Sequence, residues 1–318
     1  MRSWLFLFAC NLMWALQFTC VKLVQDQVGA LFTVWGPMTL ATILLIPLIR
    51  WEKRDAYQNS RRSKQDIVVY FLLALLGVFP AQMFITWGTR WSLASNAALL
   101  MLTLPVSTAV LAHIFLGEQM TPVRWASFAL AIVGVLMCSN IDFAHLNFGK
   151  GYLLGNTLVF LGTLGSSFYN SYGKKMLERY SPLEMLFYTY GAMFILMTPL
   201  VVTQEGDVFR RLGSFTPQTW VGMALLTFFH NYLSMVLFLK ALKQLDAIQA
   251  ALSNYLITFF GVPIAAIWLH EKMTPLAVVG GAIILGSTLL ITLWKGKAAS
   301  AAPPELVSER GGSSNGQA

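Results

Sequence analysis

The sequence predicts an all-α integral membrane protein with ten transmembrane helices, arranged as two inverted five-helix repeats. Hydrophobic residues make up 56% of its 318 positions and charged residues only 11%, whereas roughly 25% of residues are charged in an ordinary soluble domain. The apolar residues gather in ten long runs, and the second half of the chain repeats the first at a shift of 153 residues.

The ten apolar runs have about the length of membrane-spanning helices. Roughly 20 helical residues are needed to cross about 30 Å of hydrocarbon. Helix is the expected conformation because the backbone amides of a lipid-embedded segment must find their hydrogen-bond partners within that segment. The runs are residues 4–21, 31–49, 67–88, 93–116, 122–139, 151–172, 183–203, 218–239, 247–269 and 275–294.

The internal repeat is clearest in the second part of each half. Residues 94–136 align with residues 247–289 with 13 identities in 43 positions, where composition alone would give about four. The most similar stretch pairs Glu118-Gln119-Met120-Thr121-Pro122 with Glu271-Lys272-Met273-Thr274-Pro275. Five helices in each repeat oblige the second copy to enter the membrane from the opposite side. Inverted repeats are typical of alternating-access transporters, whose substrate site lies at the repeat interface.

The repeat and the charges predict the domain organisation. We expect a first repeat at 1–141, a connector at 142–150, a second repeat at 151–295 and a disordered cytoplasmic tail at 296–318. Sixteen Lys and Arg residues fall on the side that holds both termini and six on the other, which predicts cytoplasmic termini. The net charge of +8 resides in connectors rather than in a basic stripe, so we expect membrane lipid and no nucleic acid as a partner.

Several motifs of the two halves occur together in one known family. They are Trp14-Ala15 near the start, Trp87-Gly88-Thr89-Arg90, Ala94-Ser95-Asn96-Ala97-Ala98-Leu99-Leu100, Leu104-Pro105-Val106 and Leu116-Gly117-Glu118, repeated in part as Ala250-Ala251-Leu252 and Leu269-His270-Glu271. This pattern resembles the EamA-type domain of the drug/metabolite transporter superfamily over residues 1–295. The resemblance implies ten helices, a cell (plasma or inner) membrane location and transport of a small metabolite.

Two departures from the family pattern leave the substrate open. Pro105 has no counterpart at Thr258, and Pro263 stands one turn further along. The arginine that many members carry early in the second helix is absent, and Trp35-Gly36-Pro37 occupies that region.

The acidic residues and the motifs exclude several kinds of chemistry. All 14 Asp and Glu fall in loops or at helix ends, which disfavours a carboxylate proton relay or a sodium site at the bilayer midplane. His270-Glu271 lacks the second histidine of a zinc-protease motif, and no nucleophile elbow or phosphate loop is found. The three cysteines lie in apolar runs and imply no disulfide framework. We therefore expect no enzyme activity, no cofactor and no metal.

Polar residues recur at helical spacing along several of the runs and must face inward, because unpaired amides in hydrocarbon are costly. Small Ser, Thr and Gly residues are typical of close helix packing. Larger polar and aromatic residues are candidates for a substrate cavity, and His230 is the candidate pH-sensitive group because an unperturbed imidazole titrates near pH 6.5. The predicted substrate-binding residues are Trp14, Gln17, Gln82, Asn96, Tyr169, Asn170, His230, Asn231, Tyr232, Asn254 and Tyr255.

Three further features have structural interpretations. Glu118 and Glu271 each precede a Thr-Pro pair that begins a helix, so we expect them to stabilise helix ends. Lys22 either extends its ammonium group to the membrane surface or takes part in function, as the family resemblance implies. Gly151 and Gly155 form a small-residue motif compatible with a homodimer.

These observations predict a transporter that moves a small neutral or zwitterionic solute, with an amino acid or a related metabolite as the first candidate. A facilitator or exporter of other solutes, such as nucleosides or amphipathic drugs, is the alternative within transport. A non-transporting membrane scaffold or a membrane enzyme is the alternative from another class, and solute flux in proteoliposomes distinguishes these classes.

The charge distribution makes a testable prediction about topology. In a cysteine-free background, an impermeant thiol reagent applied to intact cells should label a cysteine at Asn147 and spare one at Asn59, because the 50–66 loop is predicted to be cytoplasmic. Labelling at Asn59 together with protection at Asn147 would reverse the assigned orientation.

Overall fold

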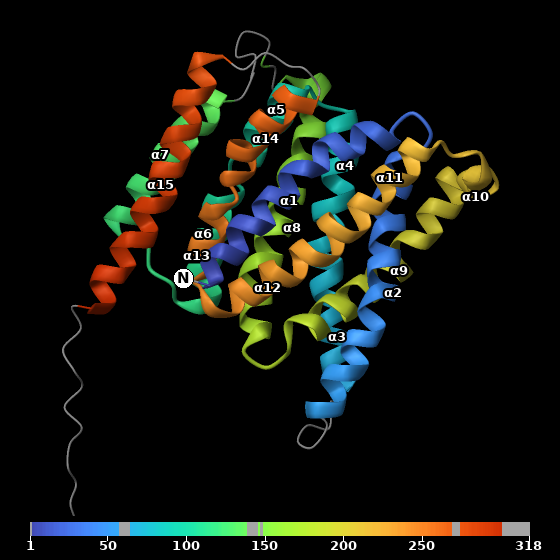
Figure 1. The fold of residues 1–318 in the computed structure, drawn as a ribbon, viewed down its shortest axis with the longest axis horizontal. Helices are drawn as coiled ribbons and strands as arrows, with labels where there is room; N and C mark the ends of the chain where they lie inside the picture. The colour runs from blue at the N-terminus through green and yellow to red at the C-terminus, as the bar shows by residue number, and fades with distance from the viewer. Residues whose placement is uncertain (1, 57–63, 139–145, 147–148, 269–273, 301–318) are drawn as a thin grey trace, which may run out of the picture.

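The protein is described by a computed structural model that covers residues 2–56, 64–138, 146, 149–268 and 274–300. Every regular element among these residues is helical, and the helices form one bundle (Figure 1). The first repeat holds α1 (Arg2–Val24), α2 (Ala30–Ala56), α3 (Lys64–Leu73), η1 (Ala74–Val78), η2 (Pro80–Phe84), α4 (Ile85–Arg90), α5 (Ala94–Met101), α6 (Leu104–Leu116) and α7 (Pro122–Cys138).

The second repeat has the same order of long helices with short additions at its connectors. It holds η4 (Lys150–Tyr152), α8 (Leu153–Leu177), α9 (Pro182–Glu205), α10 (Val208–Arg211), η5 (Leu212–Ser214), α11 (Pro217–Leu225), η6 (Leu226–Leu233), α12 (Ser234–Gln244), α13 (Ala247–Ser253), α14 (Leu256–Trp268) and α15 (Pro275–Ser300).

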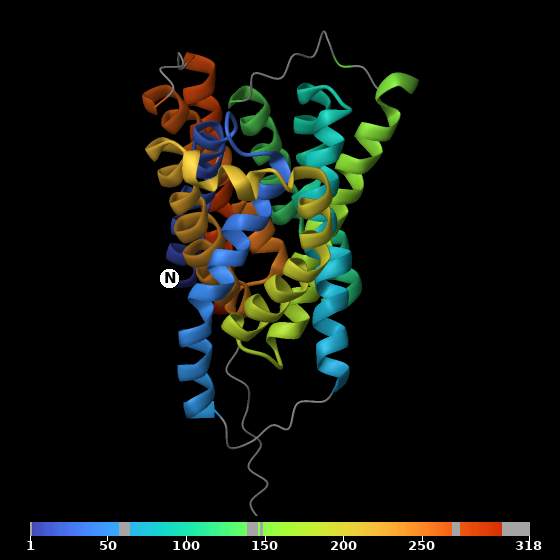
Figure 2. The same ribbon diagram turned by 90° about the vertical axis from the view of Figure 1, so that its right-hand side faces the viewer.

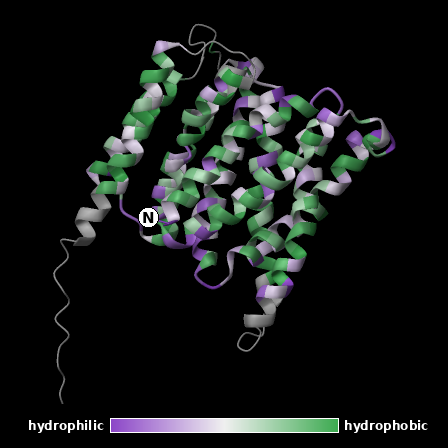
Figure 3. Ribbon diagram, in the orientation of Figure 1, coloured by the Kyte–Doolittle hydropathy of each residue, from purple (hydrophilic) through white to green (hydrophobic). Residues whose placement is uncertain are grey.

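The helices coincide with the predicted apolar runs, and several continue beyond them into charged residues. Within the described residues, eight spans are long and apolar enough to cross a membrane. The apolar α7 is shorter, and α8 has 25 residues with many Gly, Ser, Thr and Asn side chains. Hydrophobic colour runs along the helices, and hydrophilic colour gathers at their ends (Figure 3). The last turns of α2 and the first of α3 project beyond the other helices at one end of the bundle (Figures 1 and 2).

The two repeats exchange their first helices. The helix α1 packs mainly against α11, η6, α12 and α14 of the second repeat, whereas α8 packs against η1, η2, α4 and α6 of the first. We call α1, α2 and α11–α14 with η6 the first helix group, and α3–α6 with η1, η2, α8 and α9 the second helix group. The remaining pair, α7 and α15, packs together along its length. Each helix group therefore contains helices of both repeats.

Equivalent helices of the two repeats run antiparallel where they meet. At one end of the α2–α9 pair, the Glu205 carboxylate accepts hydrogen bonds from the amides of Leu31 (3.1 Å) and Phe32 (2.8 Å) at the start of α2. At the other end, the Ser181 hydroxyl at the start of α9 donates to Glu52 (2.7 Å). Glu52 and Glu205 are 153 residues apart, so the repeat places a carboxylate at each end of the same seam.

The third helix of each repeat is locally widened into π-helix, at η1 and η2 in the first repeat and at η6 in the second. Pro80 begins η2 and lacks an amide for the regular helical ladder. In η6 the Asn231 side chain donates to the carbonyl of Leu226, five residues earlier (2.9 Å). Widened turns of this kind are frequent at functional sites.

Glycines allow the closest approaches between helices. A Cβ atom at Gly134 of α7 would lie 2.7 Å from the carbonyl oxygen of Gly280 of α15, so neither position has room for a side chain. Gly155 is equally confined, because its Cβ would lie 2.3 Å from the carbonyl oxygen of Trp91. Gly155 of the proposed dimer motif is thus used within the chain, and the motif gives no support for a dimer.

The Glu205 contact makes a prediction about stability. Glu205→Ala removes the carboxylate from two amides at the start of α2, and loss of such a cap costs about 0.5–2 kcal/mol. We expect a lower thermal midpoint in detergent for Glu205→Ala than for Gln204→Ala, an exposed neighbour on the same turn. Equal midpoints for the two variants would show that the contact does not stabilise the fold.

Candidate functional site

Each repeat contains one interrupted helix, and the interruptions occupy equivalent positions. Regular helix stops between α5 and α6 at Leu102 and Thr103, and between α13 and α14 at Asn254 and Tyr255. At both interruptions the amides bond to carbonyls three residues earlier, as for Thr103 to Leu100 (3.0 Å) and Tyr255 to Leu252 (3.2 Å). The turns are therefore tightened, and some backbone carbonyls are left for other partners.

The two interruptions touch each other. The Tyr255 hydroxyl donates to the carbonyl oxygen of Leu102 across the repeat interface, at 3.2 Å. Leu102 and Tyr255 are 153 residues apart, so equivalent positions are in direct contact. Equivalent positions of two repeats can meet only near the axis that relates the repeats. The interruptions consequently mark the centre of the protein.

The helix α1 brings polar groups to this centre. The Asn11 amide donates to the Ser253 hydroxyl at the end of α13 (3.1 Å). One turn later, Trp14 packs its ring against Phe238 with centroids 5.1 Å apart. Within the described chain, the Trp14 indole nitrogen and the Asn254 amide oxygen are buried without a hydrogen-bond partner. This unpaired donor and this unpaired acceptor are available to a solute or to water.

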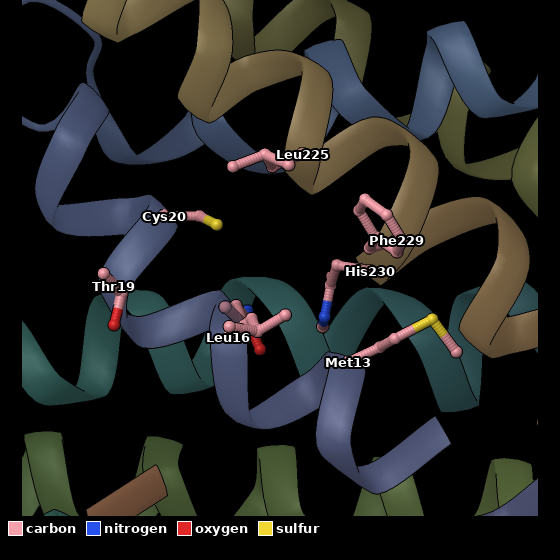
Figure 4. Close-up of a pocket in the computed structure, with 8 residues that line it drawn as sticks. Met13, Leu16, Thr19, Cys20, Leu225, Phe229 and His230 are labelled. Atoms are coloured by element: carbon pink, nitrogen blue, oxygen red, sulfur yellow. The ribbon is translucent and has the colours of Figure 1, made fainter. Parts of the chain in front are cut away.

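A second part of the candidate site is a small cavity between α1 and η6 of about 80 Å³. Phe229 and His230 project from η6 toward Met13 and Leu16 of α1 across this space (Figure 4). At about 30 Å³ per water molecule, the volume suits a group of a few heavy atoms rather than a complete metabolite. The cavity is lined by Met13, Leu16, Gln17, Thr19, Cys20, Leu225, Phe229 and His230.

The π-helical turn separates the roles of His230 and Asn231. Regular helical spacing predicts that both share one face with Thr227 and Ser234, but the widened turn directs His230 to the cavity. Asn231 is buried and bonded to Leu226, and its carbonyl accepts the Tyr190 hydroxyl at 3.0 Å. The Nδ1 atom of His230 is among the buried atoms without a partner in the described chain. His230 is therefore available to a solute, whereas Asn231 holds the π-helical turn in place.

Tyr169 and Asn170 lie on α8, in the second helix group, and both are buried. Tyr169 packs closely on η1: a Cβ atom added at Gly77 would lie 3.1 Å from the Cβ atom of Tyr169. Gln82 of η2 is half-buried, and its backbone carbonyl accepts a hydrogen bond from the Thr86 hydroxyl (2.6 Å). These three residues come from helices of the second helix group that pack together.

Two of the predicted site residues lie elsewhere. Asn96 is buried in the first turn of α5, where its amide donates to Asn156 of α8 (3.3 Å). It holds two helices together nearly two turns before the interruption. Tyr232 is half-buried and packs against the exposed ring of Phe228, with centroids 5.7 Å apart, and it does not line the cavity.

The small hydroxyl residues mostly have structural partners. Thr163 and Thr227 donate to carbonyls four residues earlier on their own helices, at 2.9 and 2.8 Å. Ser167 and Ser171 of α8 donate across to the carbonyls of Leu104 and Thr108 on α6, each at 3.1 Å. Ser167 and Ser171 thus bond across a helix interface, whereas Thr163 and Thr227 bond within their own helices.

Sequence reasoning missed several residues of the site. Asn11 shares a polar stripe with Trp14 and Gln17, and that spacing was the available signal. Ser253 and Leu102 act through the meeting of two helix interruptions, which no local pattern reveals. Tyr190 lies in the aromatic and apolar sequence of α9, where nothing distinguishes it from a core residue.

Fold and site together describe a multi-pass helical membrane protein with a polar centre between two repeats. The chain belongs to the EamA-like transporter family, whose model matches residues 1–140 and 153–293. A protein of known crystal structure shares the fold with a TM-score of 0.76 at 14% identity, covering 93% of this chain and 98% of that one.

Relatives with similar sequences are transporters by name. A probable terminal-alkyne amino-acid exporter of Streptantibioticus cattleyicolor is 26% identical over 284 residues, covering 87% of this chain and 89% of the relative. An S-adenosylmethionine uptake transporter of Rickettsia conorii is 24% identical over 261 residues, 81% of each chain. An uncharacterized transporter of Archaeoglobus fulgidus is 24% identical over 92% of this chain and 99% of its own. The chain is therefore a transporter of small molecules.

The different surroundings of His230 and Asn231 make a prediction. Asn231→Ala removes the side-chain bond that satisfies Leu226 in the π-helical turn, and we expect a loss of about 1–3 kcal/mol in stability. His230→Ala should leave the thermal midpoint closer to that of the unmodified protein and should weaken solute binding, because the Nδ1 atom of His230 has no partner within the described chain. A larger loss of stability in His230→Ala, with unchanged solute affinity by calorimetry, would contradict this division of roles.

Proposed function

We propose that this protein carries a small neutral or zwitterionic organic solute across the cell membrane by alternating access. The contact between the two interruptions, Tyr255 to Leu102, carries the proposal. Interrupted helices at a repeat interface are a common place for substrate sites in transporters, because their free backbone groups and polar side chains replace the water around the solute. The unpaired atoms of Asn254, the residue before Tyr255, and of Trp14 on α1 are the first candidates for binding the solute.

The absence of charge from the site supports an uncharged or zwitterionic solute. In the described ranges, every Asp and Glu lies in a connector or near a helix end. Both solutes named for the relatives, an amino acid and S-adenosylmethionine, contain an amino-acid group. An amino acid or a related metabolite is therefore the first candidate substrate. Gln17 and His230 would contribute to its binding from the adjacent cavity.

The topology that we propose has ten transmembrane helices, with α7 and α8 added to the eight longest apolar spans. The antiparallel contact of the equivalent helices α2 and α9 supports an inverted relation between the repeats. Both termini would then be cytoplasmic. We propose the repeat boundaries at 1–141 and 151–295 and the tail at 296–318 on the same basis.

Alternating access would move the two helix groups. The sequence alone suggests that one repeat rocks against the other, but each repeat contributes its first helix to the packing of its partner. Motion of whole repeats would break the extensive α1 and α8 contacts. Motion of the two helix groups preserves these contacts and changes the seams that join the groups, at α2–α9, at α6–α13, and where α12 and α13 meet α8 and α9.

An amphipathic solute, including a drug-like molecule, is the second candidate. The α1–η6 cavity is lined mainly by apolar side chains, Met13, Leu16, Leu225 and Phe229 among them, and suits an apolar group. Export of such a solute and export of an apolar amino acid would use the same surfaces. A thermal-shift screen of both classes on the purified protein distinguishes them.

Substitutions at the centre test the proposal. Trp14→Phe keeps an aromatic ring and removes the unpaired indole N–H donor. Asn254→Leu removes the unpaired amide oxygen. Each should weaken binding of an amino acid identified by thermal shift by roughly twofold to tenfold, since one hydrogen bond contributes about 0.5–1.5 kcal/mol. Thr86→Val is the matched control, because the Thr86 hydroxyl bonds to its own helix.

The measurement is solute affinity by calorimetry, with uptake into proteoliposomes as a second readout. Unchanged affinity in both Trp14→Phe and Asn254→Leu, with normal folding, would place the binding site elsewhere. Absence of flux for every solute that stabilises the unmodified protein would favour the scaffold alternative.

A further inference from the structure

Glu118 joins the two helix groups at one end of the bundle. It follows α6 of the second group, and its carboxylate accepts hydrogen bonds from the amides of Ala247 (2.7 Å) and Ile248 (3.0 Å) at the start of α13 in the first group. The sequence predicts that Glu118 serves the helix that follows it, α7. The Thr121 hydroxyl takes that place instead, accepting from the Arg124 amide at 3.3 Å.

The local backbone explains why Glu118 reaches α13. Gly117 ends α6 in the left-handed conformation, with φ of 69°, which residues with a side chain rarely adopt. The chain therefore leaves the axis of α6 at this residue. The next residue, Glu118, is carried across the α6–α13 seam rather than along α6.

Further polar contacts surround Glu118 at the same end. Arg124 of α7 forms an ion pair with Asp246, the residue that precedes α13. The Lys174 ammonium group of α8 donates to the carbonyls of Leu242 and Leu245 at the end of α12. Lys174 belongs to the second helix group and α12 to the first, so this contact also crosses between the groups.

The helix α13 runs from the Glu118 contact to the candidate site. The seven residues of α13 run from Ala247, whose amide Glu118 binds, to Ser253, just before the interruption at Asn254, which is about 10 Å of helix. All seven residues are buried. The buried α13, which packs against α6, therefore links the Glu118 contact to the candidate site.

We propose that Glu118 is a gate residue: its carboxylate leaves the Ala247 and Ile248 amides each time the solute path opens at this end, and rebinds them when it closes. The proposal rests on the alternating access proposed above, and it adds the residue that controls one of the two openings. Glu118 is half-buried, so water can solvate the released carboxylate without placing a charge in lipid. The Arg124–Asp246 ion pair supports the closed position of α13.

The experiment measures opening directly and requires no substrate. In a background with Cys10, Cys20 and Cys138 replaced by alanine, a single cysteine at Ala250, a fully buried residue of α13, reports access to water. We expect the rate of its reaction with a small charged thiol reagent to rise severalfold in Glu118→Ala. Asp246→Asn, which weakens the ion pair, should raise the rate to a smaller extent.

Glu205→Ala is the matched control. Glu205 binds two amides at the start of α2 with nearly the same geometry as Glu118 at α13. This contact lies at the other end of the α2–α9 pair from the Ser181–Glu52 hydrogen bond. A purely structural role for Glu118 predicts that both variants lose thermal stability and that neither changes the reaction rate at Ala250. That result would overturn the proposal.

Two outcomes separate this proposal from the proposed function. A raised labelling rate in Glu118→Ala, with solute flux absent even from the unmodified protein, supports the gate and contradicts transport. Unchanged labelling with normal flux in Glu118→Ala overturns the gate and leaves transport standing. If Glu118→Ala does not fold, Asp246→Asn and Glu118→Gln supply the same comparison, and unchanged labelling in both again overturns the gate.

Discussion

The structure depends on one constraint: in lipid, each backbone group freed at a helix end or interruption needs a partner from the protein. The amides at the starts of α2 and α13 receive the carboxylates of Glu205 and Glu118, and the carbonyl of Leu102 receives the Tyr255 hydroxyl. Each of these partners comes from the other repeat. A single repeat would leave these groups unsatisfied, so the two repeats depend on each other for folding.

The exchange of first helices follows from the same dependence. The helices α1 and α8 carry the side chains that reach the opposite interruption, as Asn11 reaches Ser253 and Ser167 reaches Leu104. Small residues let these helices approach closely, and hydroxyl groups bonded to nearby carbonyls keep polar atoms from facing lipid. The resulting helix groups combine both repeats, which is why we propose the helix groups, and not the repeats, as the units that move.

The sequence predicts the helices and the repeat because both rest on local patterns, apolar length and residue identity at a fixed shift. It does not predict which residues meet across the repeat interface. Glu118 was expected to serve the helix that follows it and serves α13, since the choice depends on a turn at Gly117 and on tertiary packing. His230 and Asn231 look equivalent at helical spacing, and only the π-helical turn in η6 separates them. Asn96 carries the polarity expected of a site residue but satisfies Asn156 at a helix end.

The short helix α13 connects the polar centre at the helix interruptions with the hydrogen bonds of Glu118. Its first residues are held by Glu118, and its last residue, Ser253, is held by Asn11. A buried helix of seven residues spans only about two turns, which is too short to bend appreciably between its ends. A displacement at one end must therefore move the other end as well. The polar centre and the contact at Glu118 are consequently coupled through a rigid element, and such an element is a physical basis for coupling between two sites. A solute that changes the position of Asn254 would change the geometry of the Glu118 hydrogen bonds.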